Sequence, residues 1–134
     1  MIITVPSEIK YVKEISSKIT KSLLPYKLEE EALFDIKLCV EEAVRNAIVH
    51  GNRSNRKLPV KVDCRVDDGI LNIEVEDRGA GFDHKLLPDP TKDGNILRNS
   101  GRGVYLILKL MDKVEFNESG NRIRMIKRFR TLDA

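Results

Sequence analysis

Two pairs of alternating strands, each joined by a short turn, constrain the fold of this chain most. The first pair is PVKVDCRV, residues 59–66, and ILNIEVED, residues 70–77, joined by Asp67-Asp68-Gly69. Asp-Gly between two alternating runs is a strong β-hairpin signal. The second pair lies within KVEFNESGNRIRMIKRF, residues 113–129, which turns near Ser119-Gly120. Because a hairpin pairs its strands antiparallel, we expect a largely antiparallel sheet.

Three helices are predicted to accompany these strands. The first follows the short strand IITV, with Ser7 placed to cap it and Pro25 ending or interrupting it. Its apolar stripe is Ile9, Val12, Ile15 and Ile19. The second is predicted over residues 28–49, with Gly51 as its C-terminal cap. Its stripe is Leu28, Ala32, Ile36, Val40, Ala43 and Ala47. The third is predicted over residues 104–111.

The order of these elements indicates the fold class. Helices do not alternate with strands one by one, which argues against a Rossmann sheet. We predict an α+β fold, a two-layer α/β sandwich whose mixed, mostly antiparallel sheet carries its helices on one face. With no repeat or linker, residues 1–134 are expected to form one domain. The unexplained part is a loop of about 25 residues, since loops that long are usually functional lids or disordered.

The composition excludes several classes of protein. Apolar residues make up 41% of the chain, enough for one core, yet no apolar run approaches the roughly 20 residues that span a bilayer. The N-terminus has no signal-peptide pattern, so we predict a cytoplasmic protein that does not contact membranes. Cys39 and Cys64 lack metal-ligand spacing and are predicted to be buried thiols in a reducing cytosol.

The net charge of +3 comes mainly from the C-terminal third. Apolar Ile123 and Met125 alternate there with basic residues, which is typical of the solvated face of an edge strand. The basic residues are Arg122, Arg124, Lys127, Arg128 and Arg130. This pattern gives no reason to expect direct nucleic-acid binding, which would need a clustered basic face.

The segment EEAVRNAIVHGN, residues 41–52, aligns polar side chains beside a buried stripe. Glu42, Asn46 and His50 are four residues apart and share one helix face, and Glu41 lies about 100° away. These side chains could form a plain solvent-facing edge. Alternatively, a carboxylate could act as a general base and an amide oxygen could ligate Mg²⁺. His50, at the helix end, could cap, pack or touch a ligand.

Two glycine-containing segments follow. In VEDRGAGFD, residues 75–83, Asp77 ends a strand and could cap the next turn or accept a hydrogen bond from an exocyclic amine. Gly79 and Gly81 would let backbone approach a ligand closely. In NSGRGVYLI, residues 99–107, glycines precede the third helix. That arrangement is either a plain cap or a phosphate site made by backbone amides at a helix start.

Taken together and in this order, the three segments resemble the sequence boxes of the GHKL superfamily. Its gyrase, histidine-kinase and mismatch-repair ATPases share the Bergerat ATP-binding fold. The resemblance covers nearly the whole chain, element order included. EAVRNAIVHGN, VEDRGAGFD and GRGVYLILKLMDKVEF look most like the bacterial anti-sigma-factor serine kinases, which are stand-alone domains of about this length.

The resemblance implies that ATP and Mg²⁺ are the cofactors. Asn46 matches the asparagine that ligates Mg²⁺, and Glu42 matches the carboxylate that activates the nucleophile. Asp77 matches the aspartate that receives the adenine amino group. Gly79 and Gly81 match the glycines beside the base and ribose.

The remaining matches lie around the phosphates and the adenine. Gly101, Arg102 and Gly103 match the box that meets the phosphates, Arg78 lies beside the adenine pocket, and residues 84–100 match the ATP lid. The family often has Gly-Thr before its last strand, whereas this chain has Gly120-Asn121. Asparagine can also hydrogen-bond, which makes Asn121 a candidate contact to adenine.

The implied function is that of an ATP-dependent serine protein kinase and anti-sigma factor, usually a homodimer. It would sequester a sigma factor and phosphorylate the anti-anti-sigma protein that antagonises it. The alternative is an ATP-binding module that acts by sequestering a partner without kinase activity. A detached histidine-kinase catalytic domain is disfavoured, because neither His50 nor His84 lies on a dimerising helix.

Overall fold

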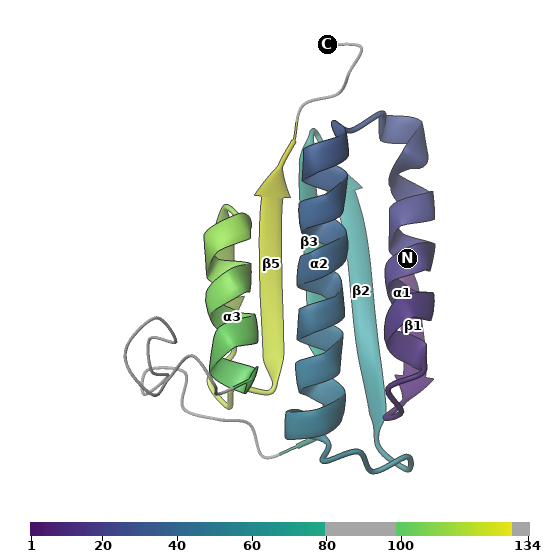
Figure 1. Cartoon of the computed structure of the whole chain (residues 1–134), viewed down its shortest axis with the longest axis vertical. Helices are drawn as coiled ribbons and strands as arrows, with labels where there is room; N and C mark the ends of the chain where they lie inside the picture. The colour runs from purple at the N-terminus through teal and green to yellow at the C-terminus, as the bar shows by residue number, and fades with distance from the viewer. Residues whose placement is uncertain (80–98, 130–134) are drawn as a thin grey trace.

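The computed structural model describes residues 1–79 and 99–129, with the backbone alone over residues 99–102. One antiparallel sheet in the order β1-β2-β3-β5-β4 carries three helices on one face (Figure 1). The strands are β1 (Ile2–Pro6), β2 (Pro59–Asp67), β3 (Ile70–Glu76), β4 (Lys113–Phe116) and β5 (Arg122–Arg128). The helices are α1 (Tyr11–Leu23), α2 (Glu30–Asn46) and α3 (Asn99–Leu110). The predicted two-layer α+β fold is confirmed.

The core lies between the sheet and α2, the central helix, which contacts both α1 and α3 (Figure 1). Ile36 and Val40 of α2 are fully buried, as are Val62 of β2 and Ile73 of β3. Apart from Ile9, the residues of the predicted apolar stripes are therefore buried or partly buried in this core. Cys39 and Cys64 are free, buried thiols, and burial raises their pKa values to about 12 and about 11. Within the described residues, no helix is both long and apolar enough to cross a membrane.

Both predicted hairpins are present. The β2–β3 turn places Asp68 and Gly69 at φ values of 50° and 74°, as a two-residue hairpin turn requires. In the β4–β5 turn, Gly120 takes a φ of 77°. Pro25 lies in a short 3₁₀ turn, Leu24–Tyr26, that ends α1. The order of elements along the chain is as predicted, and the local turn signals were sufficient to establish the two hairpins, β2–β3 and β4–β5.

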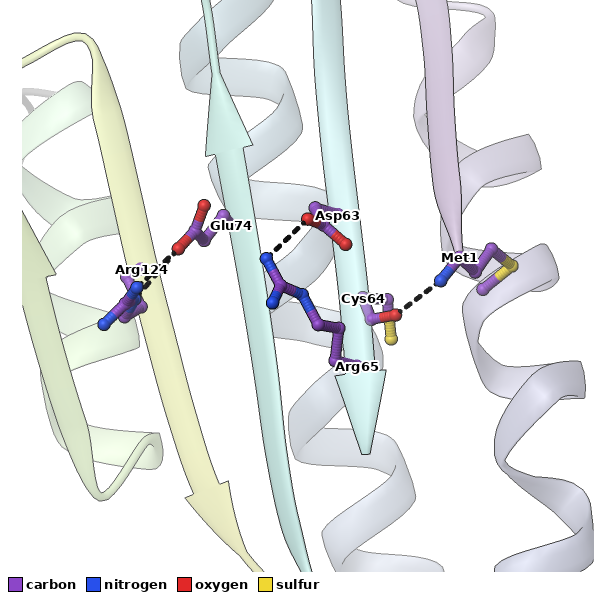
Figure 2. Close-up of polar contacts among 6 residues, drawn as sticks. All are labelled: Met1, Asp63, Cys64, Arg65, Glu74 and Arg124. Carbon is purple, nitrogen blue, oxygen red and sulfur yellow. Dashed lines mark hydrogen bonds and ion pairs between the residues drawn. The ribbon is translucent and has the colours of Figure 1, made fainter. Parts of the chain in front are cut away.

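The prediction that the basic C-terminal strand is an edge strand was wrong. Strand β5 lies between β3 and β4, so its neighbours satisfy both of its sides. The alternation has a different cause, because the sheet has one face without helices. Arg124 on that face pairs with Glu74 at 2.9 Å, and Arg65 pairs with Asp63 at 3.0 Å (Figure 2). Lys127 points the other way and donates to the carbonyl of Leu110 at 2.8 Å.

Three helix ends differ from the predictions. Helix α1 begins at Tyr11 without a side-chain cap, which leaves Ile9 half exposed before it. Ser7 is buried and donates instead to the carbonyl of Leu58 at 2.6 Å. Helix α2 begins at Glu30, and a π-helical turn, Ala47–Gly51, follows it. Helix α3 begins at Asn99, so the glycines predicted to precede it lie inside it.

Candidate functional site

A cavity of about 200 Å³ lies at one end of the molecule. The C-terminal end of α2, the N-terminal end of α3, the end of β3 and the start of β5 meet at this end (Figure 1). The residues around the cavity are Ala43, Asn46, Ala47, His50, Gly51, Val75, Asp77, Val104, Ile107, Phe116, Gly120, Asn121, Arg122 and Ile123. The predicted residues Asn46, His50, Asp77 and Asn121 therefore surround one space, although 75 positions separate the first from the last.

The predicted line of polar side chains on α2 holds in part. Asn46 and His50 both line the cavity, whereas Glu42, one helical turn before Asn46, is not among the lining residues. Glu42 accepts a hydrogen bond from Arg45 at 2.9 Å. Glu41 is directed elsewhere and accepts a hydrogen bond from Ser16 of α1 at 2.7 Å. Of the two neighbouring glutamates, Glu42 is thus the one available to the site.

Gly103 brings α3 against the side chains of Glu42 and Asn46. A Cβ atom at this position would lie 2.7 Å from Oε2 of Glu42 and 3.1 Å from Nδ2 of Asn46. Glycine therefore allows the backbone of α3 to contact both candidate residues directly. The backbone of Gly101 and Arg102 lies in the first turns of α3. The arginine side chain, like Gly81 and most of the predicted lid at residues 84–100, lies outside the described residues.

Asp77 is only 8% exposed and lies where β3 ends. Its Oδ1 accepts a hydrogen bond from the amide of Gly79 at 2.8 Å. Burial raises the pKa of the carboxyl above its ordinary value, and this hydrogen bond opposes part of that rise. A buried carboxylate beside a mainly apolar cavity is suited to accept a hydrogen bond from an N–H group on a ligand that is otherwise largely apolar.

Two glycines allow the chain to pack closely around Asp77. A Cβ at Gly51 would lie 2.3 Å from Oδ2 of Asp77, and a Cβ at Gly79 would lie 1.9 Å from the carbonyl oxygen of Gly51. The prediction that Gly51 caps the C-terminus of α2 was wrong, because Gly51 is the last residue of the π-helical turn and the positive φ values fall on Arg53 and Ser54. Gly51 is instead required by the close approach of the carboxylate.

Asn121 joins β5 to Asp77. Its carbonyl accepts the amide of Asp77 at 2.9 Å, and its Nδ2 donates to the carbonyl of Asp77 at 3.3 Å. Its Oδ1 accepts a hydrogen bond from Asn117 at 2.6 Å. Asn121 therefore lies at the cavity, and its side chain already supports the strand end that carries Asp77.

Asn52 is a site residue that the sequence analysis missed. It is 2% exposed, and its Oδ1 accepts the backbone amide of Arg78 at 2.7 Å. Its Nδ2 donates to Ser7 Oγ at 2.8 Å and to the carbonyl of Pro59 at 3.0 Å. No local pattern identifies this role, because its partners lie 26 and 45 positions away.

Comparisons with known proteins agree on one family. A family model described as the histidine kinase-like ATPase domain matches residues 5–127. An anti-sigma F factor of Clostridium botulinum is 31% identical over 107 residues, which cover 76% of this chain and 75% of that protein. The serine-protein kinase RsbW of Staphylococcus aureus is 30% identical over 131 residues, covering 92% of this chain and 82% of that protein.

A solved structure shares the fold. The RsbU and RsbW domains of a Mycobacterium tuberculosis protein match with a TM-score of 0.64 at 15% identity, covering 96% of this chain and 31% of that chain. The chain belongs to the histidine kinase-like ATPase family, within the GHKL superfamily, and the resemblance to bacterial anti-sigma-factor serine kinases is confirmed. Membership of this family implies ATP use.

The described residues fit a nucleotide with a divalent cation better than a metal held by protein alone. They contain no group of three or more His, Cys, Asp or Glu side chains that could hold a metal ion. Mg²⁺ usually binds through one or two protein oxygens together with substrate phosphates and water. The side-chain oxygen of Asn46, at the cavity and next to Gly103, suits that mode.

Proposed function

We propose that this protein is an ATP-dependent serine kinase and anti-sigma factor built as one ATP-binding domain. A single arrangement supports the proposal. Asp77 and Asn46 line one cavity, and Gly103 lies against both Asn46 and Glu42. This order matches a ligand with a purine base at one end and phosphates at the other.

The base would bind at Asp77. The carboxylate would accept a hydrogen bond from the adenine amino group, Gly51 and Gly79 leave room for the carboxylate and the turn that carries it, and Val75 and Ile107 provide apolar walls. Arg78 and Gly81 are proposed neighbours of the base and ribose, and Asn121 is proposed to complete the pocket.

The phosphates would lie toward α3. Gly101, Arg102 and Gly103 are proposed to meet them, and Asn46 is proposed to hold Mg²⁺ through its amide oxygen. When bound, the cation neutralises the charge that develops on the transferred phosphoryl group.

Glu42 is proposed as the general base. It would take the proton of a serine hydroxyl on the partner protein while the serine oxygen bonds to the γ-phosphorus and ADP leaves. Arg45 holds one carboxylate oxygen at 2.9 Å, which leaves Oε2 on the side of Gly103. The protein thus supplies orientation and a proton acceptor.

The proposed partners follow from the relatives. One relative is named an anti-sigma F factor and others are named serine-protein kinases. We propose that this chain acts in the cytoplasm as a homodimer, sequesters a sigma factor and phosphorylates an anti-anti-sigma protein. Phosphorylation would add negative charge to the antagonist and weaken its binding, which leaves the sigma factor captured.

One observation favours a second candidate function, an ATP-binding module that sequesters a partner without kinase activity. The carboxylate of Glu42 is already engaged by Arg45 of the same helix. An ion pair with a half-exposed arginine contributes less than about 1 kcal/mol, so a substrate hydroxyl can displace it. Kinase activity therefore remains the main proposal.

The test begins with calorimetric titration of the protein with ATP, with and without Mg²⁺, using Asp77→Asn as the control. We expect Mg²⁺-dependent binding that the control loses. Transfer of labelled γ-phosphate to candidate anti-anti-sigma proteins from the same genome then tests the chemistry. Glu42→Gln should keep ATP binding and lose transfer. Transfer at the wild-type rate would refute the role of Glu42, and binding without any transfer would favour the sequestration module.

A further inference from the structure

The buried amide of Asn52 connects three segments that meet behind the candidate base pocket. Ser7 follows β1, Pro59 begins β2, and Arg78 follows β3. Asn52 bonds to all three, at 2.8 Å to Ser7 Oγ, 3.0 Å to the carbonyl of Pro59 and 2.7 Å from the amide of Arg78. The chemistry proposed above does not use this residue.

We propose that Asn52 is the positioning residue for recognition of the nucleotide base. It acts through Asp77, and the inference rests on the proposed binding of ATP. In the turn Asp77-Arg78-Gly79 both backbone amides after Asp77 are engaged. Asn52 accepts the first, and the Asp77 carboxylate accepts the second at 2.8 Å. Loss of the hydrogen bond from Arg78 to Asn52 would free the segment between Asp77 and Gly79. The amide of Gly79 is the donor that holds the Asp77 carboxylate.

The other side of Asp77 is held independently, since its backbone amide donates to the carbonyl of Asn121 at 2.9 Å. The Asp77 carboxylate can therefore change direction mainly when the backbone of the following turn, residues 77–79, rotates. The backbone of Gly51 lies against that turn, and Asn52 is the next residue. Asn52 thus sets the direction of the carboxylate relative to the cavity.

Asparagine is the side chain that suits this position. The site needs one acceptor for an amide and two donors for a hydroxyl and a carbonyl, supplied by a side chain that is itself buried. Aspartate has no donors when ionised, and serine has a single donor. Because Asn52 is buried and both its amide oxygen and its amide nitrogen are hydrogen-bonded, the orientation of the amide is strongly specified.

The experiment measures base selectivity. Calorimetry gives the Kd of ATP and of purine riboside triphosphate, which lacks the 6-amino group, for the wild-type protein, Asn52→Ala and Ser7→Ala. Ser7→Ala is the matched control, because it removes a hydrogen bond of the same Asn52 amide but leaves the bond to Arg78. The ratio of the two Kd values reports on the Asp77 contact and is unaffected by a general loss of stability.

We expect the wild-type protein to prefer ATP, Asn52→Ala to reduce that preference about tenfold, the factor of roughly one hydrogen bond, and Ser7→Ala to retain it. A folded Asn52→Ala variant with the wild-type ratio overturns the inference. A wild-type protein without any preference overturns adenine recognition by Asp77, and this inference with it. Should Asn52→Ala not fold, amide hydrogen exchange of Arg78 in the wild-type protein decides, because exchange at the rate of an unstructured peptide also overturns the inference.

Discussion

Gly103→Ala is expected to separate stability from activity. Gly103 lies inside α3, where alanine is more favourable than glycine by about 0.5–1 kcal/mol. The new Cβ would lie 2.7 Å from Oε2 of Glu42, whereas ordinary contact begins near 3.4 Å, so the carboxylate must move by about 0.7 Å. Because a side-chain end moves easily, the strain is small, and the half-exposed ion pair with Arg45 adds little to stability.

The expected result is a melting temperature that is unchanged or higher by about 2–5 °C, measured by circular dichroism. Phosphoryl transfer to the partner protein should fall by roughly 100-fold, since a misplacement on the order of 1 Å has that effect on a positioned catalytic group. The variant should also weaken Mg²⁺-dependent ATP binding, because Asn46 lies 3.1 Å from the same Cβ position.

Leu108→Ala is the control for changes in α3 itself. Leu108 is 50% exposed and is not among the residues that line the cavity. It should leave ATP affinity and transfer at the wild-type level. The reasoning is refuted if Gly103→Ala binds ATP and transfers phosphate as the wild-type protein does, or if it unfolds the protein.

Three further outcomes are expected. Asn46→Ala should abolish the Mg²⁺-dependent part of ATP binding in calorimetry, and an unchanged affinity would remove the metal assignment. Because burial raises the pKa of Asp77, ionisation opposes folding, and stability falls as the pH rises from the ordinary value of 3.8 through the raised one. Asp77→Asn should therefore melt at or above the wild-type temperature at pH 7 and lose that advantage below pH 3.8, and a lower melting temperature at pH 7 would contradict this. Cys39 and Cys64, with pKa values near 12 and 11, should not react with Ellman's reagent at pH 8 until the protein is denatured, so rapid labelling of the native protein would contradict their burial.

The pairing within each hairpin was predictable because its signals are local. Asp68 and Gly69 take the left-handed conformations that a tight hairpin needs, and they do so whatever the rest of the fold provides. The alternation of Ile123 and Met125 with arginines likewise predicted which side chains face inward. It could not predict the place of β5 in the sheet, because a strand with one helix-free face has the same pattern at an edge and in the interior.

The helix ends were not predictable, because long-range partners decide them. Serine is a common helix-capping residue, but the hydroxyl of Ser7 donates instead to the carbonyl of Leu58, 51 positions away. The start of α3 was placed too late because glycine is a poor helix former. In the structure Gly103 lies within α3, against Glu42.

The glycines show why a motif predicts the kind of site more readily than its shape. Gly51 leaves room for a carboxylate, Gly79 leaves room for the carbonyl of Gly51, and Gly103 leaves room for Glu42 and Asn46. In the sequence all three have the same meaning, a backbone free of a side chain. Their different neighbours follow from the order of elements, which brings the end of α2 against both β3 and α3. Asn52 lies where the same elements meet, and for that reason a residue to which the sequence analysis gave no role can control the carboxylate on which recognition of the base is proposed to depend.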